Sequence, residues 1–299
     1  MWVVESQAYE LDIGPHVWPI TKYRLIRQAL GSSADLQFAE PAPAGWDDLA
    51  LVHTPEYLEK TRLGTLTPDE IAQLEIPWSH DIASGFRLMA GGTVHAARLA
   101  LTGRIAVHLG GGLHHAFANH GEGFCMFNDV AIAIRCLQRD GSIRRAAVVD
   151  CDVHHGNGTA MIFGRDTDVF TFSIHQQHNY PMWKPPSDLD IGLPDGTRDE
   201  GYLTKLADAL ETVLAHRPGV VGYLAGADPF VEDRLGGLSL TKEGLRRRDR
   251  LVFDVCRRAA IPVFVTLAGG YARRVQDTVD IHVGTVGEAC RTWGLGARA

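Results

Sequence analysis

Short apolar runs alternate with helical segments through the last two thirds of the chain, and this alternation constrains the fold more than any other feature. The apolar runs are predicted strands and cover residues 105–109, 146–149, 169–174, 220–225 and 262–267. Helical spacing predicts helices over residues 128–137, 199–215, 240–259 and 272–291. Strands that alternate with helices form βαβ units. We therefore expect an α/β fold with three layers, α/β/α, around a mainly parallel central sheet.

The first hundred residues predict further helices. Helical spacing covers residues 21–30, 68–74 and 84–101, and Thr54 followed by Pro55 is a typical helix start. The last of these segments contains Gly91 and Gly92, which predict close packing against a neighbouring element. Because the sequence has no internal repeat, low-complexity tract or linker, we expect one domain over residues 1–299.

The amino-acid composition limits the kinds of binding partner and the cellular compartment that we expect for the protein. The formal net charge of the 299 residues is −7, so a direct nucleic-acid partner is not expected. One basic cluster, residues 246–250, lies in a predicted helix and is expected to be a solvated face. The five cysteines form no CxxC motif, which favours a reducing compartment. With no secretory signal and no apolar run of membrane-spanning length, the expected location is the cytoplasm.

Residues 150–159, DCDVHHGNGT, directly follow the predicted strand 146–149. Side chains alternate along an extended chain, so Asp150, Asp152 and His154 are expected to point to one side. Two carboxylates next to a core repel each other and lose hydration unless a cation neutralises them. This stretch therefore predicts half of a metal site at the carboxyl end of a strand, where open α/β sheets bind their ligands.

Other predicted strand ends carry residues of the same kind. His114 and His115 follow a glycine triplet, and a tandem pair in this place favours catalysis. Asp228 follows another strand and suits a third metal ligand, although alone it would be read as a turn or N-cap aspartate. Tyr271 follows the last strand and two glycines; alone it would be an ordinary packed aromatic, but its hydroxyl could donate to an oxyanion.

These residues lie in five motifs that occur in the same order in a known family. The motifs are VHTPEYLE, GGGLHHAF with GFCMFNDVAIA, DCDVHHGNGT, GADPFVEDRLGGLSLT and LAGGY. All five in order are far more specific than any one of them. The chain resembles the zinc-dependent histone deacetylases of the arginase/deacetylase superfamily and is most similar to their class IV branch and its bacterial relatives. The resemblance extends over about residues 52–283.

The resemblance implies a role for each matching residue. Asp152, His154 and Asp228 would be the zinc ligands. His115 would be the general base, and His114, backed by Asp150, would act by its charge or as a proton shuttle. Tyr271 would polarise the amide carbonyl and stabilise the oxyanion.

Further matches imply a substrate tunnel and a second cation. Gly123 and Phe124, with Tyr180 opposite, would line the tunnel for a lysine side chain. Asp150, Ser173 and Ile174, with Asp152 and the His154 carbonyl, would bind a monovalent cation, usually potassium. The chain departs from some members of the family at Asn157, where they carry an aspartate, so the partner of His115 would be a neutral amide.

The resemblance implies a zinc-dependent deacylase that hydrolyses N-acyl-lysine, with an acetyl or a longer fatty acyl group, in proteins or peptides. The alternatives are a deacetylase of small N-acyl amines such as acetylpolyamines, and a module that binds acyl-lysine without turnover. The complete set of His114, His115, Tyr271 and three ligands argues against the binding module. A ureohydrolase of the arginase type fits less well, because it needs a second metal and more carboxylates.

Overall fold

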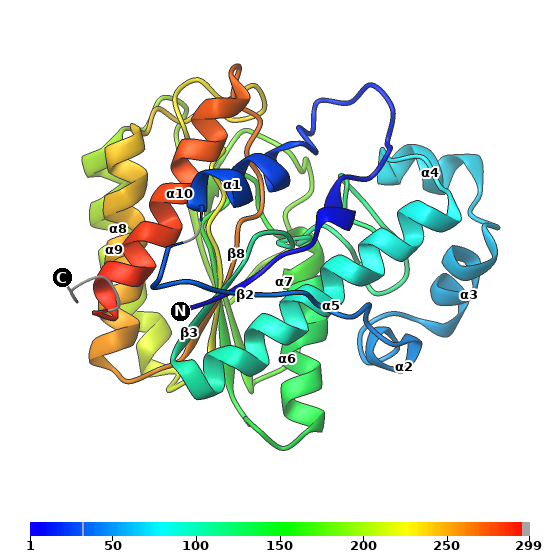
Figure 1. The fold of residues 1–299 in the computed structure, drawn as a ribbon, viewed down its shortest axis with the longest axis horizontal. Coiled ribbons are helices and arrows are strands. Elements are labelled where there is room, and N and C mark those ends of the chain that lie inside the picture. The colour runs from blue at the N-terminus through cyan, green and yellow to red at the C-terminus, as the bar shows by residue number, and fades with distance from the viewer. Residues whose placement is uncertain (32, 295–299) are drawn as a thin grey trace.

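The computed structural model describes residues 1–31 and 33–294 and contains one central sheet with helices on both faces (Figure 1). The eight strands run in the order β2-β1-β3-β8-β7-β4-β5-β6, and every neighbouring pair is parallel. They are β1 (Trp2–Val4), β2 (Gln37–Ala39), β3 (Ile105–His108), β4 (Ala146–Asp150), β5 (Val169–Gln176), β6 (Leu189–Leu193), β7 (Val221–Leu224) and β8 (Val263–Thr266). This confirms the expected three-layer α/β fold.

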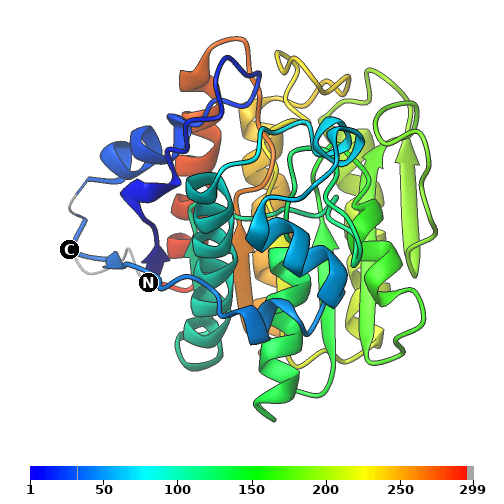
Figure 2. The ribbon, with the colours of Figure 1, turned by 90° about the vertical axis from the view of Figure 1, so that its right-hand side faces the viewer.

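The helices divide between the two faces of the sheet (Figures 1 and 2). One face is covered by α5 (His80–Gly103) and α6 (Asp129–Arg139), with α2 (Trp46–Leu49), α3 (Pro55–Leu63), α4 (Pro68–Leu74) and α7 (Asn157–Phe163) beyond them or near the sheet edge. The other face is covered by α1 (Lys22–Leu30), α8 (Asp199–Ala215), α9 (Lys242–Arg258) and α10 (Val275–Thr292). A short 3-10 helix, η1 (Gln7–Tyr9), precedes α1.

Successive side chains of each central strand belong alternately to the hydrophobic cores on the two faces of the sheet. In β8, Val263 and Val265 belong to the core under α8, α9 and α10, whereas Phe264 belongs to the core under α5 and α6. Successive side chains of a strand point to opposite faces, so a strand buried on both faces is apolar throughout. This is why the central strands were readable from the sequence as continuous apolar runs.

The predicted close packing of the glycine pair in α5 is present. A Cβ on Gly91 would lie 1.9 Å from the carbonyl oxygen of Ala42, and one on Gly92 would lie 2.3 Å from Nε2 of His108. Both contacts are closer than atoms can approach, so α5 can lie against the residue 42 loop and β3 only with glycine at these positions.

Three strands were missed from the sequence, β1, β2 and β6, and each belongs to the outer part of the sheet. β1 and β2 have three residues each, too few for a periodic pattern. β6 alternates exposed with intermediate or buried residues and forms one edge. Within the described residues, no helix is long and apolar enough to cross a membrane.

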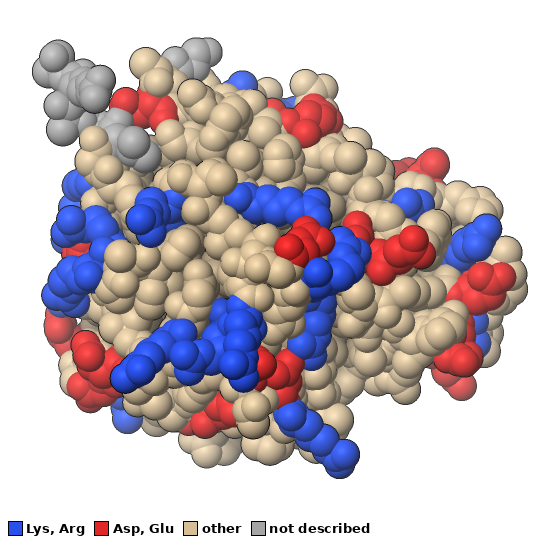
Figure 3. Space-filling model, turned by 90° about the horizontal axis from the view of Figure 1, so that it is seen from below, with Lys and Arg blue, Asp and Glu red and all other residues tan. Residues whose placement is uncertain are grey.

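Seen from below, Lys and Arg form bands on the surface with Asp and Glu among them (Figure 3). Basic side chains of the protein form ion pairs with acidic ones. Arg144 pairs with Asp168 at 3.3 Å ahead of β4 and β5, and Arg139 at the end of α6 pairs with Asp48 at 2.6 Å. These carboxylates offset part of the positive charge.

The expectation that the arginine cluster of α9 is a solvated face was wrong for Arg248. Its side chain is fully buried and forms an ion pair with Asp249. Its guanidinium also donates to the carbonyl oxygens of Cys151 at 3.3 Å and Gly226 at 2.6 Å. These carbonyls belong to the loops after β4 and β7, so Arg248 ties two neighbouring strand ends together.

Replacing Arg248 by Met should lower the free energy of unfolding by about 3–5 kcal/mol, because Asp249 would remain buried without its cation. Urea denaturation of the metal-free protein measures this loss. The exposed Arg246 on the same helix is the matched control, and Arg246→Met should change the free energy by less than about 0.5 kcal/mol. Equal losses in the two variants would contradict the buried role.

Candidate metal centre

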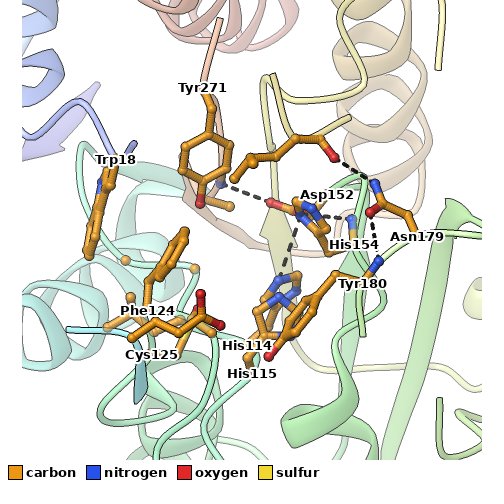
Figure 4. Close-up of a pocket in the computed structure, with 18 of the residues that line it drawn as sticks. Trp18, His114, His115, Phe124, Cys125, Asp152, His154, Asn179, Tyr180 and Tyr271 are labelled. Carbon is orange, nitrogen blue, oxygen red and sulfur yellow. Dashed lines mark hydrogen bonds and ion pairs between the residues drawn. The ribbon is translucent and has the colours of Figure 1, made fainter. Parts of the chain in front are cut away.

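The polar residues singled out in the sequence meet at the carboxyl ends of four neighbouring strands. In the sheet these strands lie in the order β3-β8-β7-β4, and the loops after them carry the histidine pair, Tyr271, Asp228 and residues 150–154. Parallel strands all end on the same edge of the sheet, so loops distant in the chain converge there. Figure 4 shows several of these side chains around one cavity.

Asp152, His154 and Asp228 form the group best suited to hold a metal ion. All three are buried, and one possible ligand atom from each lies within 4.8 Å of the others. Nδ1 of His154 is 3.0 Å from Oδ1 of Asp152 and 3.4 Å from Oδ2 of Asp228. Burial, followed by the charge of Asp152, raises the pKa of Asp228 to about 7. Two buried carboxylates that repel each other in this way favour the binding of a cation between them.

A buried carboxylate oxygen of Asp228 also indicates a metal site. Its Oδ2 is buried and has no hydrogen-bond partner among the described residues. A buried carboxylate oxygen without a partner is costly, and a metal–oxygen bond would satisfy it. Two carboxylates and one imidazole fit a divalent first-row ion such as zinc and leave coordination positions open.

Backbone groups from the neighbouring loops orient the ligands. The N–H of Gly269 donates to Oδ2 of Asp152 at 2.9 Å, and the N–H of Val153 donates to Oδ1 of Asp228 at 2.9 Å. A Cβ on Gly269 would lie 2.0 Å from Oδ2 of Asp228, so only glycine permits this close approach. Such outer contacts fix the orientation of the candidate ligands.

The two adjacent histidines have opposite electrostatic environments. Nδ1 of His114 lies 2.7 Å from Oδ2 of Asp150, and Nδ1 of His115 lies 2.7 Å from Oδ1 of Asn157. Burial alone would lower the pKa of His114, but the carboxylates of Asp150 and Asp152 raise it to about 9. Burial and the nearby charge of His114 hold the pKa of His115 well below its usual value. The pKa values of the two adjacent imidazoles are therefore shifted in opposite directions.

The predicted tunnel residues line one cavity together with Tyr271. Gly123, Phe124 and Tyr180 all border it, and the rings of Phe124 and Tyr271 have centroids 6.0 Å apart. The cavity contains about 190 Å³ of water-accessible space. The backbone N–H of Tyr271 donates to Asp233 at 2.7 Å, which fixes the loop that presents its ring.

Sequence reasoning missed several residues at the cavity. Trp18 and Tyr23 line it from the segment between η1 and α1 and from the start of α1, and Glu75 lines it from the end of α4. Lys22 is buried beside it and donates to the carbonyl oxygen of Ala268 at 2.7 Å; burial lowers its pKa to about 8. None of the four lies at the end of a strand. A search for polar residues directly after predicted strands, which identified the other site residues, could therefore not find them.

The residues expected to bind a monovalent cation lie on neighbouring strands. Ser173 of β5 is the register partner of Asp150 of β4, and Ile174 is buried next to it. Beside them is a second group that could hold a metal ion, formed by His155, His175 and Asp190. In the structure Nε2 of His155 is 3.1 Å from Asp190, and Nδ1 of His175 is 3.0 Å from the hydroxyl of Ser173.

Comparisons with known proteins agree on one family. A model of the histone deacetylase domain matches residues 16–286. An uncharacterised protein of Picosynechococcus sp. is 44% identical over 271 residues, which cover 89% of this chain and 90% of that protein. Histone deacetylase 2 of Arabidopsis thaliana is 30% identical over 299 residues, covering 93% and 77%. A histone deacetylase-like amidohydrolase of Pseudomonas aeruginosa is 31% identical over 280 residues, covering 85% and 72%.

Replacing Asp228 by Asn should reduce bound metal and stabilise the metal-free protein. The change removes one of two facing charges but keeps an oxygen for the N–H of Val153. We expect the free energy of unfolding in chelator to rise by on the order of 1–3 kcal/mol, since one pKa unit corresponds to about 1.4 kcal/mol. Elemental analysis and urea denaturation measure the two effects.

The exposed Asp208 on α8 provides the control. Asp208→Asn should retain the metal and change the free energy of unfolding by less than about 0.5 kcal/mol. Full metal content in Asp228→Asn would show that Asp228 is not a ligand.

Proposed function

The chain belongs to the histone deacetylase family, as its motifs predicted, and is a hydrolase; on this premise we propose that it removes acyl groups from N-acyl-lysine in peptides or proteins. One observation carries the proposal, namely that His114, His115 and Tyr271 line a single cavity with Asp152 and His154, two of the three candidate metal ligands, and the third, Asp228, lies directly behind these two. We assign residues 1–299 to one catalytic domain of the class IV type.

Asp152, His154 and Asp228 would hold a zinc ion in this proposal. When bound, zinc supplies Lewis-acid chemistry, which lowers the pKa of water and polarises a carbonyl group. Side chains of the protein would carry out the proton transfers and stabilise the developing charge. His115 would accept a proton from the attacking water and so act as the general base.

His114 and Tyr271 act on the charge that develops during the reaction. His114 is held protonated by Asp150 and offsets negative charge close to the reacting carbonyl. The Tyr271 hydroxyl stays protonated, because burial raises its pKa well above its usual value, and it can donate to the oxyanion. His115 then passes the proton it took from water to the leaving amine, so that the C–N bond breaks and lysine and a carboxylate are released.

The cavity lining supports an acyl group longer than acetyl. Phe124 and Tyr180 offer flat rings to the methylene chain of lysine, and Tyr180 also stands over His115 with ring centroids 5.0 Å apart. The lining also includes Trp18, Tyr23 and Leu113, which offer apolar surface to an alkyl chain. We therefore propose acetyl-lysine and longer fatty acyl-lysine as substrates.

We also propose that Asp150, Ser173 and Ile174 bind a structural potassium ion, with Asp152 and the carbonyl of His154. The pairing of β4 with β5 supports this, because it sets Asp150 and Ser173 side by side. A monovalent ion there would offset part of the negative charge that Asp150 and Asp152 bring to the strand end.

The purified protein should hydrolyse acetyl-, octanoyl- or myristoyl-lysine peptides, and Tyr271→Phe should lower kcat by roughly 10²–10³-fold, because one oxyanion donor is lost. The variant should keep its metal, since the Tyr271 side chain is not a ligand. Steady-state assays with each peptide and elemental analysis measure both effects.

Complete removal of metal by a chelator should abolish the activity, and added zinc should restore it. Activity that persists without metal would overturn the mechanism. Equal rates for the wild-type protein and Tyr271→Phe would remove Tyr271 from it.

One observation favours a second substrate class, the small cationic N-acyl amines such as acetylpolyamines. Glu75 lines the cavity from the C-terminal end of α4. Partial burial is the main cause that raises the pKa of its carboxyl group, and the nearby His16 offsets only part of that rise. A carboxylate at this place would attract an ammonium group several bonds from the amide.

Glu75→Gln should raise KM for an acetylpolyamine by about 10-fold, because the variant loses one charge–charge contact, and should leave KM for a neutral-flanked acetyl-lysine peptide unchanged. Parallel assays of the two substrates measure the difference. An equal change in both values would exclude recognition of the distant ammonium by Glu75.

A further inference from the structure

We propose that Glu122 is a positioning residue that fixes the orientation and tautomer of His115 through the side chain of Asn157. The inference rests on the proposed role of His115 as the base. Glu122 lies in the loop between β3 and α6, and none of the five motifs singles it out. Glu122, Asn157 and His115 are linked by hydrogen bonds, and the effect of Glu122 depends on which atom donates and which accepts in each bond.

The three side chains form a short line into the cavity. Nδ2 of Asn157 donates to Oε1 of Glu122 at 2.6 Å, and Oδ1 of Asn157 lies 2.7 Å from Nδ1 of His115. An ionised carboxylate can only accept, so the amide must turn its NH₂ group toward Glu122. Its oxygen then faces His115, and Nδ1 must carry the proton that this oxygen accepts. The other ring nitrogen, Nε2, is left with its lone pair free.

Asn157 alone could not impose this arrangement. The oxygen and nitrogen of an amide have nearly the same shape, and a flipped amide would present NH₂ to His115. Nδ1 would then become an acceptor and Nε2 would carry the proton, so Nε2 could not take one from water. A carboxylate at position 157 would exclude that state by itself. With an amide there, the acceptor that decides its orientation is Glu122.

Glu122 is well held in its charged form. Its other oxygen accepts from Nε2 of Gln73 at 3.0 Å, Oε1 also accepts from the Tyr180 hydroxyl at 3.1 Å, and His120 lies 3.6 Å away. Burial would raise its pKa, but the hydrogen bonds from His120, Asn157 and the other partners lower it to about 2. An isolated antiparallel β-bridge between Glu122 and Cys125 also fixes the turn that carries Glu122. The anchor is therefore ionised at any pH at which the enzyme works.

The test uses an exchange of the amide and the carboxylate. In Glu122→Gln the anchor no longer has to accept, so both orientations of Asn157 become possible, and kcat should fall roughly 10–100-fold with little change in KM or metal content. In the double variant Glu122→Gln, Asn157→Asp, the carboxylate introduced at position 157 accepts directly from Nδ1 of His115 and from the amide introduced at position 122. The kcat of the double variant should return to within about 3-fold of the wild-type value.

A matched control and the third variant complete the cycle. Glu56→Gln, at an exposed position in α3, should leave kcat unchanged. Asn157→Asp alone places two carboxylates in contact and should lose activity as well as stability. If Glu122 only held Gln73 and Tyr180 in place, adding Asn157→Asp to Glu122→Gln would fail to restore activity.

The tautomer can also be measured without turnover. In metal-free protein labelled with ¹⁵N-histidine, a protected Nδ1–H signal that disappears in His115→Ala should be present in the wild-type protein and the double variant. It should weaken in Glu122→Gln. An Nε2–H tautomer in the wild-type protein, an unchanged kcat in Glu122→Gln, or no rescue in the double variant would each overturn the proposal. A wild-type protein inactive on all acyl-lysine peptides would instead overturn the proposed function, and the tautomer measurement would still decide the role of Glu122.

Discussion

The repulsion between the buried carboxylates of Asp152 and Asp228 is the constraint on which the site depends. Neither aspartate can move away, because backbone N–H groups of Gly269 and Val153 hold them in place. Arg248 holds the loops beneath them by donating to two of their carbonyl oxygens. The fold thus gives up stability to keep a concentrated negative charge at the strand ends, and that charge is what a divalent cation would bind.

The histidine pair shows how one local sequence can give two different groups. His114 and His115 are neighbours with ring centroids 4.1 Å apart, yet one faces a carboxylate and the other an amide. The charge on His114 further discourages a second charge on His115. Two neighbouring imidazoles therefore have pKa values shifted in opposite directions, which is the arrangement that the proposed acid–base roles would need.

The sequence predicted the parts of the molecule that depend on local pattern. The central strands were readable because burial on both faces makes them apolar, and the convergence of Asp152, His154 and Asp228 followed from their common place after parallel strands. The burial of Arg248 was not predictable, because a helical stretch with four arginines in five residues looks solvated unless its partners are known. Trp18 reaches the cavity, and Glu122 reaches Asn157, only through tertiary contacts that leave no local signal.

The wide separation of the site residues along the chain has a consequence for biosynthesis. Asp152 and His154 leave the ribosome well before Asp228, and Gly269, which orients Asp152, follows later still. A nascent chain can therefore offer only part of the proposed ligand set, which is complete only when β7 and β8 lie between β4 and β3. Loading of the proposed metal would in this way depend on completion of the sheet, so a bound ion would mark molecules that have finished folding.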